Sequence, residues 1–297
     1  MNLLSICIPV VKTRFFKESL ESACQFNGVN IIVLNNAVGS EKIKVRKIIE
    51  KTVGYNQIKY WENENQIPMI DNWNRLLGFA ETAYVTILCD DDVLGENFVI
   101  NTFNNIRKYP DVSLFTVRYQ IINEIGSVER LGLTAPVCEN PWDFITCRIL
   151  GKRETFLSGI VFRRDDWHEC DGFTFLPDGW GSDDLMWFKL ALRGNSLVFN
   201  SKPDVSYRDS SISVTNNNSF GNKIKAVYLL RDEVNRLISM YSNSTDGFSK
   251  RVKKNPKQLL YHRLYPLVWI KLNHSYFVPI WLSKIISKIY VKLVTLF

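Results

Sequence analysis

The sequence of 297 residues has few of the residues that build zinc sites or disulfide frameworks. It contains three histidines and six cysteines, and no two cysteines form a C-x-x-C pair. No histidine lies near another candidate ligand along the chain, so a zinc site is not indicated. We expect the cysteines to be reduced and mostly buried thiols of a cytoplasmic protein.

Long apolar runs are also absent. No stretch reaches the roughly 18 uninterrupted apolar residues that a membrane-spanning helix needs. The apolar opening, Met1–Val11, is short and lacks both a basic start and a small-residue cleavage site. We therefore expect it to form the first strand of the fold and not a signal peptide.

Acidic residues are missing from the C-terminal part of the chain. The last one is Asp246, and ten of the 37 lysines and arginines follow it, which leaves 27 basic against 30 acidic residues before that point. The whole-chain charge of +7 is therefore a property of the tail. A nucleic-acid-binding face spread over the body is not indicated.

Short apolar runs alternate with helical patterns over the first 120 residues. We expect strands at Leu4–Val11, Asn30–Leu34, Ile58–Trp61, Tyr84–Cys89 and Val112–Val117. We expect helices between them at Phe16–Phe26, Glu41–Val53, Ile70–Ala83 and Phe98–Ile106. This alternation predicts parallel βαβ units in a Rossmann-like α/β sheet with both faces covered.

Past residue 120 the pattern is less regular. A strand is expected at Ser158–Phe162, and a helix at Asp183–Arg193 with Ser182 as its cap. The polar stretch Asn216–Asn222 is expected to be a linker that leads into a helix at Lys223–Tyr241.

Three consecutive acids, Asp90, Asp91 and Asp92, directly follow the strand expected at Tyr84–Cys89. Ligands of open α/β sheets bind beyond the carboxyl ends of the strands. Adjacent carboxylates repel one another unless a cation lies between them, and Mg²⁺ or Mn²⁺ prefers such oxygen ligands and bridges to phosphates. We expect a metal–phosphate role, and the alternative is a solvated acidic turn that caps the next helix.

A second acidic feature is the sequence D-G-W-G-S-D-D-L that begins at Asp178. Asp183 and Asp184 open the expected helix, whose dipole favours an ionised carboxylate that can accept a proton from a hydroxyl. The alternative is that the two acids only complement the helix dipole. Together the two features suit displacement at a sugar carbon that bears a nucleotide. One would bind the diphosphate leaving group through a metal ion, and the other would activate the incoming hydroxyl.

Four segments resemble glycosyltransferase family 2 in their order and spacing. They are S-I-C-I-P ending at Pro9, I-I-V-L-N-N ending at Asn36, L-C-D-D-D ending at Asp92 and G-S-D-D ending at Asp184. The resemblance covers about residues 3–215. It implies the GT-A fold, an inverting transfer from a nucleotide sugar, and Mn²⁺ or Mg²⁺ as cofactor.

The resemblance also implies roles for the first acidic segment. The family's aspartate-x-aspartate motif falls on Asp90–Asp92, which makes Asp91 the expected metal ligand and Asp92 a second one. Asp90 is expected near the donor ribose and as a further candidate ligand. The first acid of the commonest family pattern falls on Cys89.

The family's general base falls on Asp184, with Asp183 as the alternative. Trp180 is expected to stack on an acceptor sugar, or else to be a core tryptophan. Arg208 lies where the family often has a basic loop over the diphosphate, and it could clamp phosphate oxygens or form a surface ion pair. The remaining residues expected near the donor are Pro9, Val10, Asn35, Asn36, Asn65, Asn72 and Asn74, of which the last two could also be solvent-facing helix residues.

The sequence departs from the family pattern in three places. Asn35 and Asn36 replace an acidic pair of which one member usually accepts a hydrogen bond from uracil; an amide oxygen can still accept it, although the amide also brings donors. Val10 and Val11 replace the usual polar residues. The Gln-x-x-Arg-Trp motif of processive synthases is absent, which predicts a single-addition enzyme.

The basic tail has a helical pattern. After Pro279, Lys284, Lys288 and Lys292 recur at four-residue intervals beside an apolar face. That pattern suits a helix in an anionic membrane interface, and the alternative is a helix packed on the catalytic domain. We expect a GT-A domain at 1–215, divided into a nucleotide-binding half (1–118) and an acceptor-binding half (119–215), and a basic amphipathic helical extension at 216–297.

Together with the basic tail, the family resemblance implies an inverting glycosyltransferase on the cytoplasmic face of the inner membrane. Its partners would be a nucleotide sugar, with a UDP-sugar expected, and a lipid-linked saccharide of bacterial O-antigen or capsule biosynthesis, and no nucleic acid. One alternative is a sugar nucleotidyltransferase, but Val10–Phe16 lacks the glycine-rich loop of that class. The other is a catalytically degenerate binding module, which the Asn35-Asn36 replacement supports and the intact acids oppose.

Overall fold

The computed structural model describes residues 2–54, 57–210 and 219–241, together with Lys284, Ile285, Ser287, Lys288 and Val291. Residues 211–218 and most of the tail beyond residue 241, including Pro279 and Lys292, lie outside the described residues.

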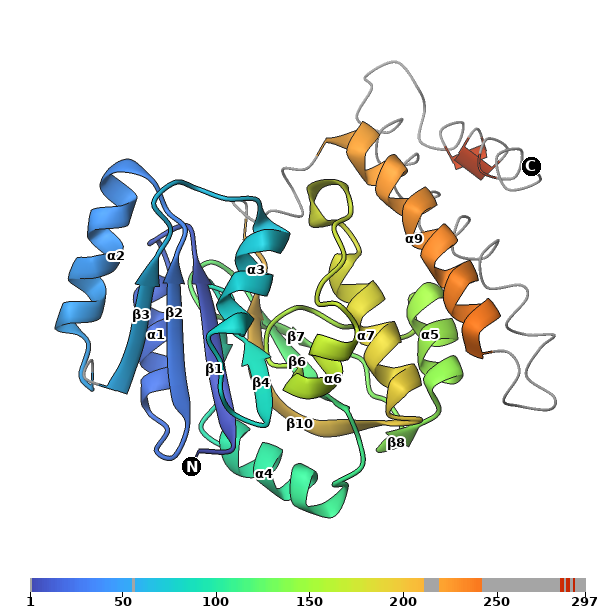
Figure 1. Cartoon of the computed structure of the whole chain (residues 1–297), viewed down its shortest axis with the longest axis horizontal. Coiled ribbons are helices and arrows are strands. Elements are labelled where there is room, and N and C mark those ends of the chain that lie inside the picture. The colour runs from blue at the N-terminus through green and yellow to red at the C-terminus, as the bar shows by residue number, and fades with distance from the viewer. Residues whose placement is uncertain are drawn as a thin grey trace.

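Ten strands of the described chain form one mixed sheet at the centre of the fold (Figure 1). The main path runs β3-β2-β1-β4-β9-β6-β10-β5, with β7 beside β6 and β8 beside β10. The strands are β1 (Leu4–Val10), β2 (Asn30–Asn35), β3 (Ile58–Glu62), β4 (Tyr84–Ile87), β5 (Val93–Leu94), β6 (Leu114–Ile122), β7 (Val128–Leu131), β8 (Cys138–Glu139), β9 (Val161–Arg163) and β10 (Leu197–Arg208). The first four are parallel, as expected, whereas β9 runs antiparallel to both β4 and β6.

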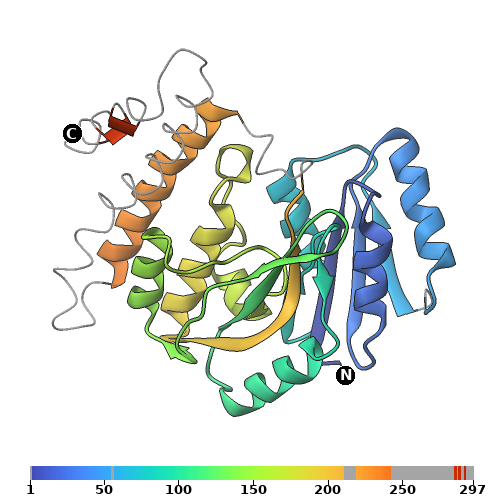
Figure 2. The same ribbon diagram turned by 180° about the vertical axis from the view of Figure 1, so that it is seen from behind.

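Helices cover both faces of the sheet (Figures 1 and 2). They are α1 (Phe16–Cys24), α2 (Gly39–Lys51), α3 (Met69–Gly78), α4 (Phe98–Lys108), α5 (Pro141–Ile149), α6 (Arg164–Glu169), the 3₁₀ helix η2 (Pro177–Gly179), α7 (Ser182–Arg193) and α9 (Phe220–Tyr241). Residues of α1, α2 and α4 form the core on one face, and residues of α3, α5, α6, α7 and α9 form the core on the other. Both views place α2 and α9 at opposite ends of the molecule.

The two cores follow from alternation along the buried strands. In β1, Ile6 and Ile8 belong to one core, while Cys7 between them belongs to the other. Successive side chains of a strand point to opposite faces, so a strand buried on both faces needs an uninterrupted apolar run. That requirement explains why the apolar runs of the first 120 residues identified the parallel strands.

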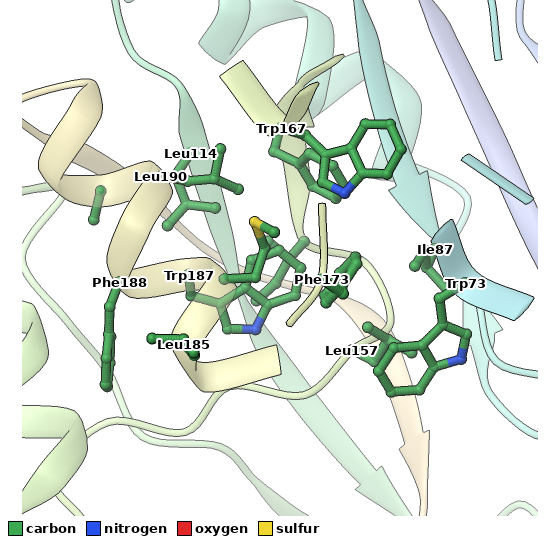
Figure 3. Close-up of a cluster of buried hydrophobic side chains, with 14 of the residues drawn as sticks. Trp73, Ile87, Leu114, Leu157, Trp167, Phe173, Leu185, Trp187, Phe188 and Leu190 are labelled. Atoms are coloured by element: carbon green, nitrogen blue, oxygen red, sulfur yellow. The ribbon is translucent and has the colours of Figure 1, made fainter. Parts of the chain in front are cut away.

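The core beneath α7 is rich in aromatic side chains (Figure 3). The ring of Trp187 lies 5.6 Å from that of Phe162 and 5.7 Å from that of Phe173, measured between centroids. Trp73 of α3 packs edge-on against Phe173 at 5.4 Å. Because these rings join α3, the loop before α7 and α7 itself, they fix the start of α7 relative to the parallel half of the sheet.

Several local expectations are wrong or need adjustment. The N-cap of α7 is Gly181 in the left-handed conformation, whereas the hydroxyl of Ser182 accepts a hydrogen bond from the N–H of Leu176. The expected linker overlaps α9, which begins at Phe220. The expected boundary at residue 118, between the nucleotide-binding and acceptor-binding halves, falls inside β6, so the two halves share one sheet. The division of binding roles between them stays a prediction.

No helix within the described ranges is both long enough and apolar enough to cross a bilayer. Of the described residues of the tail, Ser287 and Val291 are buried, while Lys284, Ile285 and Lys288 are exposed. Val291 belongs to the same core as residues of α7 and α9. These five residues therefore match the alternative of a helix packed on the domain with its lysines outward, and membrane contact stays a prediction.

Candidate active site

Asp90 ties the end of β4 to the end of β1. Its Oδ2 accepts hydrogen bonds from the backbone N–H groups of Val11 and Lys12, at 2.8 and 2.9 Å. Burial raises the pKa of the Asp90 carboxyl, and the two N–H groups act in the opposite direction. The carboxylate thus fixes the turn that follows β1 at the edge of the sheet where a ligand would bind.

Asp92 is the most buried of the three acids, with 1% of its surface exposed. Its Oδ1 accepts the backbone N–H of Arg208 at 2.8 Å, and its Oδ2 accepts the hydroxyl of Ser158 at 2.5 Å. Burial, and then the neighbouring Asp91, raise the pKa of Asp92 well above its usual range. A carboxylate that is this costly to ionise would be stabilised by a nearby cation.

Among the described residues, the Sγ of Cys89 and one carboxylate oxygen each of Asp91 and Asp92 lie within 4.8 Å of one another. Burial, and then Asp90, raise the pKa of Asp91 to about 6. The carboxylate oxygens fit a hard divalent ion such as Mn²⁺ or Mg²⁺, and the thiol is a softer donor. Asp90 lies outside this cluster. Its role as a further metal ligand and its contact with a donor ribose both stay predictions.

Arg208, at the end of β10, is buried beneath the acidic turn, with 1% of its surface exposed. Its Nε donates to the carbonyl of Asp91 at 2.8 Å, and its Nη2 to Glu18 Oε2 at 2.6 Å. Its Nη1 donates to the carbonyls of Asn123 and Glu124 at 3.2 and 3.3 Å. Arg208 therefore links the acidic turn, α1 and the β6–β7 turn. It is buried and does not form the surface ion pair considered as an alternative. A clamp by Arg208 on a diphosphate stays a prediction.

Asp183 and Asp184 open α7, as expected. Asp184 is 2% exposed, and its Oδ1 accepts hydrogen bonds from Arg148 Nε at 2.6 Å and from the hydroxyl of Thr155 at 3.3 Å. The side chain of Arg148 is 17% exposed, so this ion pair is largely buried. Asp183 is half-buried and lies nearer to solvent.

One short segment connects the two acidic sites. Thr155 bonds to Asp184 and Ser158 bonds to Asp92. Residues three positions apart span at most roughly 11 Å, so the two carboxylates are bonded to points of one short segment that lie close together. Burial first, and then the charges of both acidic sites, raise the pKa of the Tyr119 hydroxyl, which places both sites within electrostatic range of one side chain.

The amides expected to face the nucleotide base are buried and bonded within the fold. Asn35 donates from Nδ2 to the hydroxyl of Tyr60 at 2.8 Å and accepts at Oδ1 the N–H of Ala37 at 3.0 Å. Asn36 pairs with both the N–H and the carbonyl of Ile67, at 3.0 Å each. A contact between this pair and a uracil ring stays a prediction, and it would have to replace some of these bonds.

A third amide, Asn63, completes this network, and no sequence pattern had singled it out. Its Nδ2 donates to the Oδ1 atoms of Asn36 and Asn72, at 2.8 Å each. Asn72 is therefore buried and not solvent-facing. The Oδ1 of Asn63 is buried without a hydrogen-bond partner among the described residues. Asn65 is exposed on the loop that follows β3, where it is accessible to a ligand.

The other expected residues lie in less accessible positions. Pro9 and Val10 are buried in β1, and the side chain of Val10 is part of the core, so a donor contact from Val10 is restricted to its backbone. Asn74 bonds through both ends of its amide to the backbone of Phe173. Trp180 is partly buried and packs against the core, which agrees with the structural alternative for this residue.

The cysteines are free, as expected, but they are not mostly buried. Cys7 is buried, Cys138 is exposed and the other four are half-buried. Cys89 is the one whose thiol lies in the acidic cluster described above.

Solved structures share this fold. The chain is similar to residues 1–349 of S. aureus TarS in complex with UDP-GlcNAc, with 15% identity, a TM-score of 0.64, and coverage of 98% of this chain and 90% of that one. The UDP complex of the same protein gives 14% identity and a TM-score of 0.60 over the same shares of the two chains. Mannosyltransferase PcManGT from Pyrobaculum calidifontis, in complex with GDP-Man and Mn²⁺, gives 12% identity and a TM-score of 0.59 over 99% of this chain and 87% of its own.

No protein-family model matches the sequence, and no curated protein matches it. At identities this low, the structural likeness establishes the fold. The mixed α/β sheet flanked by helices is the GT-A fold, as the sequence predicted, and it is shared over nearly the full length of the chain. The particular activity and its residues are therefore matters for a proposal.

Proposed function

We propose that this protein is a glycosyltransferase that moves a sugar from a nucleotide-diphosphate sugar to a hydroxyl of a saccharide acceptor, with inversion. The observation that carries the proposal is that the two ends of one four-residue segment, Thr155 and Ser158, bond to the two carboxylate sites in a GT-A fold. Two proteins of similar fold, TarS and PcManGT, bind UDP-GlcNAc and GDP-Man respectively. Those complexes support a nucleotide sugar as the donor.

Asp91 and Asp92 would hold the divalent ion, which we propose to be Mn²⁺ or Mg²⁺. When bound, such an ion supplies positive charge to a diphosphate leaving group. Mn²⁺ in the PcManGT complex supports this choice. The protein's part is to hold the ligands still: Ser158 and the backbone of Arg208 each donate a hydrogen bond to Asp92.

Asp184 is the proposed general base, and two contacts of its carboxylate support this role. The guanidinium of Arg148 balances its charge, and the hydroxyl of Thr155 contacts the same oxygen, Oδ1. A base must be ionised and lie within hydrogen-bond reach of the acceptor hydroxyl. Asp183, which is nearer to solvent, is the alternative, and the two are distinguished by substitution.

The finer parts of the proposal concern substrates and location. We propose a UDP-sugar donor, a lipid-linked saccharide acceptor of bacterial surface polysaccharide assembly, and peripheral contact with the cytoplasmic face of the inner membrane through the tail. Ten basic residues without an acidic one beyond Asp246 support that contact. Because the two fold neighbours bind different bases, we propose that the base is selected by Asn35 and Asn36 at the end of β2 and by Asn65 on the loop after β3.

The direct test is release of free nucleoside diphosphate from a panel of nucleotide sugars with Mn²⁺, with and without an extract of lipid-linked saccharides. Wild type is compared with Asp91→Ala and with Asp111→Ala, which changes an exposed acid away from the site. We expect metal-dependent release from one donor in wild type and Asp111→Ala and none in Asp91→Ala. Asp184→Asn should abolish transfer, whereas Asp183→Asn should retain it.

Other outcomes reassign the roles. Activity that survives in Asp184→Asn and is lost in Asp183→Asn moves the base to Asp183. The anomeric configuration of the product, measured by NMR, tests inversion. If the folded protein neither releases nucleotide nor binds any nucleotide sugar, the enzymatic proposal is refuted and the chain is a non-catalytic binding module.

A further inference from the structure

The acidic turn contains a sulfur donor as well as oxygen donors. The Sγ of Cys89 lies within 4.8 Å of a carboxylate oxygen of Asp91 and of Asp92. Ligand atoms that share one ion, with metal–sulfur bonds of about 2.3 Å and metal–oxygen bonds of about 2.1 Å, lie roughly 3.6 Å apart in a tetrahedral arrangement. The three side chains therefore need only a small closure to reach a common ion.

The backbone on either side of the thiol is held in place. The N–H of Cys89 donates to the hydroxyl oxygen of Ser158 at 2.9 Å, and its carbonyl accepts the hydroxyl of Ser19 at 2.8 Å. The same Ser158 hydroxyl donates to Asp92. One serine thus positions two members of the cluster, and partners of this kind orient the ligands in metal sites.

We propose that Cys89 is a direct ligand of the divalent ion and that it shifts the preference of this site toward thiophilic ions such as Co²⁺ and Cd²⁺. The inference rests on the metal site of the proposed function and goes beyond it by adding a ligand and a metal preference. On binding, a bond forms between Sγ and the ion, and the thiol proton passes to solvent. A thiolate is a soft ligand that selects softer ions, whereas carboxylates alone suit Mg²⁺ and Mn²⁺.

The alternative is that Cys89 only fills space beside the acids, as a half-buried cysteine often does. The two roles differ in what a serine replacement does. Serine has nearly the same size, so a space-filling role predicts little change in either fold or metal binding. Loss of a ligand predicts a selective loss of affinity for thiophilic ions.

The test titrates the reduced, metal-free full chain with Co²⁺ and follows the near-ultraviolet absorption of sulfur-to-cobalt charge transfer. The variants are Cys89→Ser, Cys89→Asp and, as a matched control, Cys138→Ser, which removes an exposed thiol elsewhere. Cd²⁺ and Mn²⁺ affinities are measured by calorimetry on the same proteins. Circular dichroism and the urea unfolding midpoint verify that each variant folds.

We expect the band in wild type and Cys138→Ser and no band in the two Cys89 variants. Loss of a ligand's supporting partner typically costs about 10–100-fold in metal affinity, so Cys89→Ser should lose at least about tenfold in Cd²⁺ affinity. Mn²⁺ affinity should change far less in Cys89→Ser and should rise in Cys89→Asp, where all donors are oxygen atoms.

An unchanged band in Cys89→Ser, or an unchanged ratio of Cd²⁺ to Mn²⁺ affinity, overturns the inference. Failure of this inference is distinguishable from failure of the proposed function. If wild type binds Mn²⁺ and releases nucleotide while Cys89→Ser behaves like wild type with all ions, only the ligand assignment is wrong. If wild type binds no divalent ion at all, the metal site of the proposed function is wrong as well.

Discussion

Replacing Asp91 by asparagine is expected to stabilise the metal-free protein above neutral pH. Burial and the neighbouring Asp90 raise the pKa of Asp91 from its ordinary value of 3.8 to about 6, so its charge is unfavourable in the folded state. A shift of this size corresponds to about 3 kcal/mol when the carboxyl is ionised in both states. Solvent screens part of that energy at a partly buried side chain, so we expect a gain of about 1–2 kcal/mol in the free energy of unfolding.

The contribution of Asp91 to the stability of the folded protein falls as the pH rises. Between the ordinary pKa of 3.8 and the folded-state value of about 6, the folded protein binds more protons at Asp91 than the unfolded chain does. This group's contribution to stability is therefore fully present below 3.8 and is lost as pH rises through about 6. Asparagine does not titrate, so the advantage of Asp91→Asn should be largest above about pH 7 and should vanish below about pH 4.

A divalent ion should reverse the order of stability, so that wild type becomes more stable than Asp91→Asn. An ion that binds only the folded state stabilises it by about 2.7 kcal/mol at one hundred times its dissociation constant. Wild type should gain this energy from Mn²⁺, and Asp91→Asn should lose most of it. The proposed site therefore lowers the stability of the metal-free protein in exchange for ion binding.

The assay is urea-induced unfolding followed by tryptophan fluorescence, across the pH range, first in EDTA and then in Mn²⁺. Asp111→Asn, an exposed acid, is the control and should follow wild type under all conditions. The reasoning is refuted if Asp91→Asn is less stable than wild type in EDTA above about pH 7, or if both proteins gain equal stability from Mn²⁺.

Two further predictions concern the positioning of α7. Arg148→Met removes the cation that pairs with the buried carboxylate of Asp184 and should destabilise the protein by about 3–5 kcal/mol in urea unfolding. Arg148→Met with Asp184→Leu should recover most of that loss, and a double variant as unstable as the single one would contradict this. Gly179→Ala puts a side chain at a φ of +68°, where L residues are strained, and should destabilise by about 1–2 kcal/mol; its Cβ meets only the flexible terminal methyl of Met69, which can move aside. Gly78→Ala, where no positive φ is required and nothing lies within 4 Å of the added Cβ, is the control, and equal stability of the two glycine variants would argue against backbone strain at residue 179.

The parallel half of the fold was predictable because its strands are buried on both faces. Such strands need continuous apolar runs, and the helices between them carry apolar residues at three- and four-residue steps. The missed elements lack these signals. Strand β7 is exposed along its length, and β10 contains the polar run N-S-K-P-D in its middle. Helices α5 and α6 are short, at nine and six residues, so their periodicity carries little information.

The chemistry of the acidic sites was predictable from residue type and from position after a buried strand. Their partners were not, because each partner comes from a distant part of the chain. Ser158 and Arg208 lie 66 and 116 positions from Asp92, and Arg148 lies 36 positions from Asp184. No local pattern relates such residues.

Three features could be inferred without the structure: the α/β class, the strand with three aspartates at its carboxyl end, and the acidic pair at the start of a helix. They could be inferred because burial of strands and the dipole of a helix act within a few residues along the chain. The packing of distant elements sets three others: Asp90 turns toward the end of β1, Cys89 lies beside Asp91 and Asp92, and Arg208 is buried inside the fold. Side chains of adjacent residues leave the backbone in different directions, so which of them share a site depends on the elements that pack around each one.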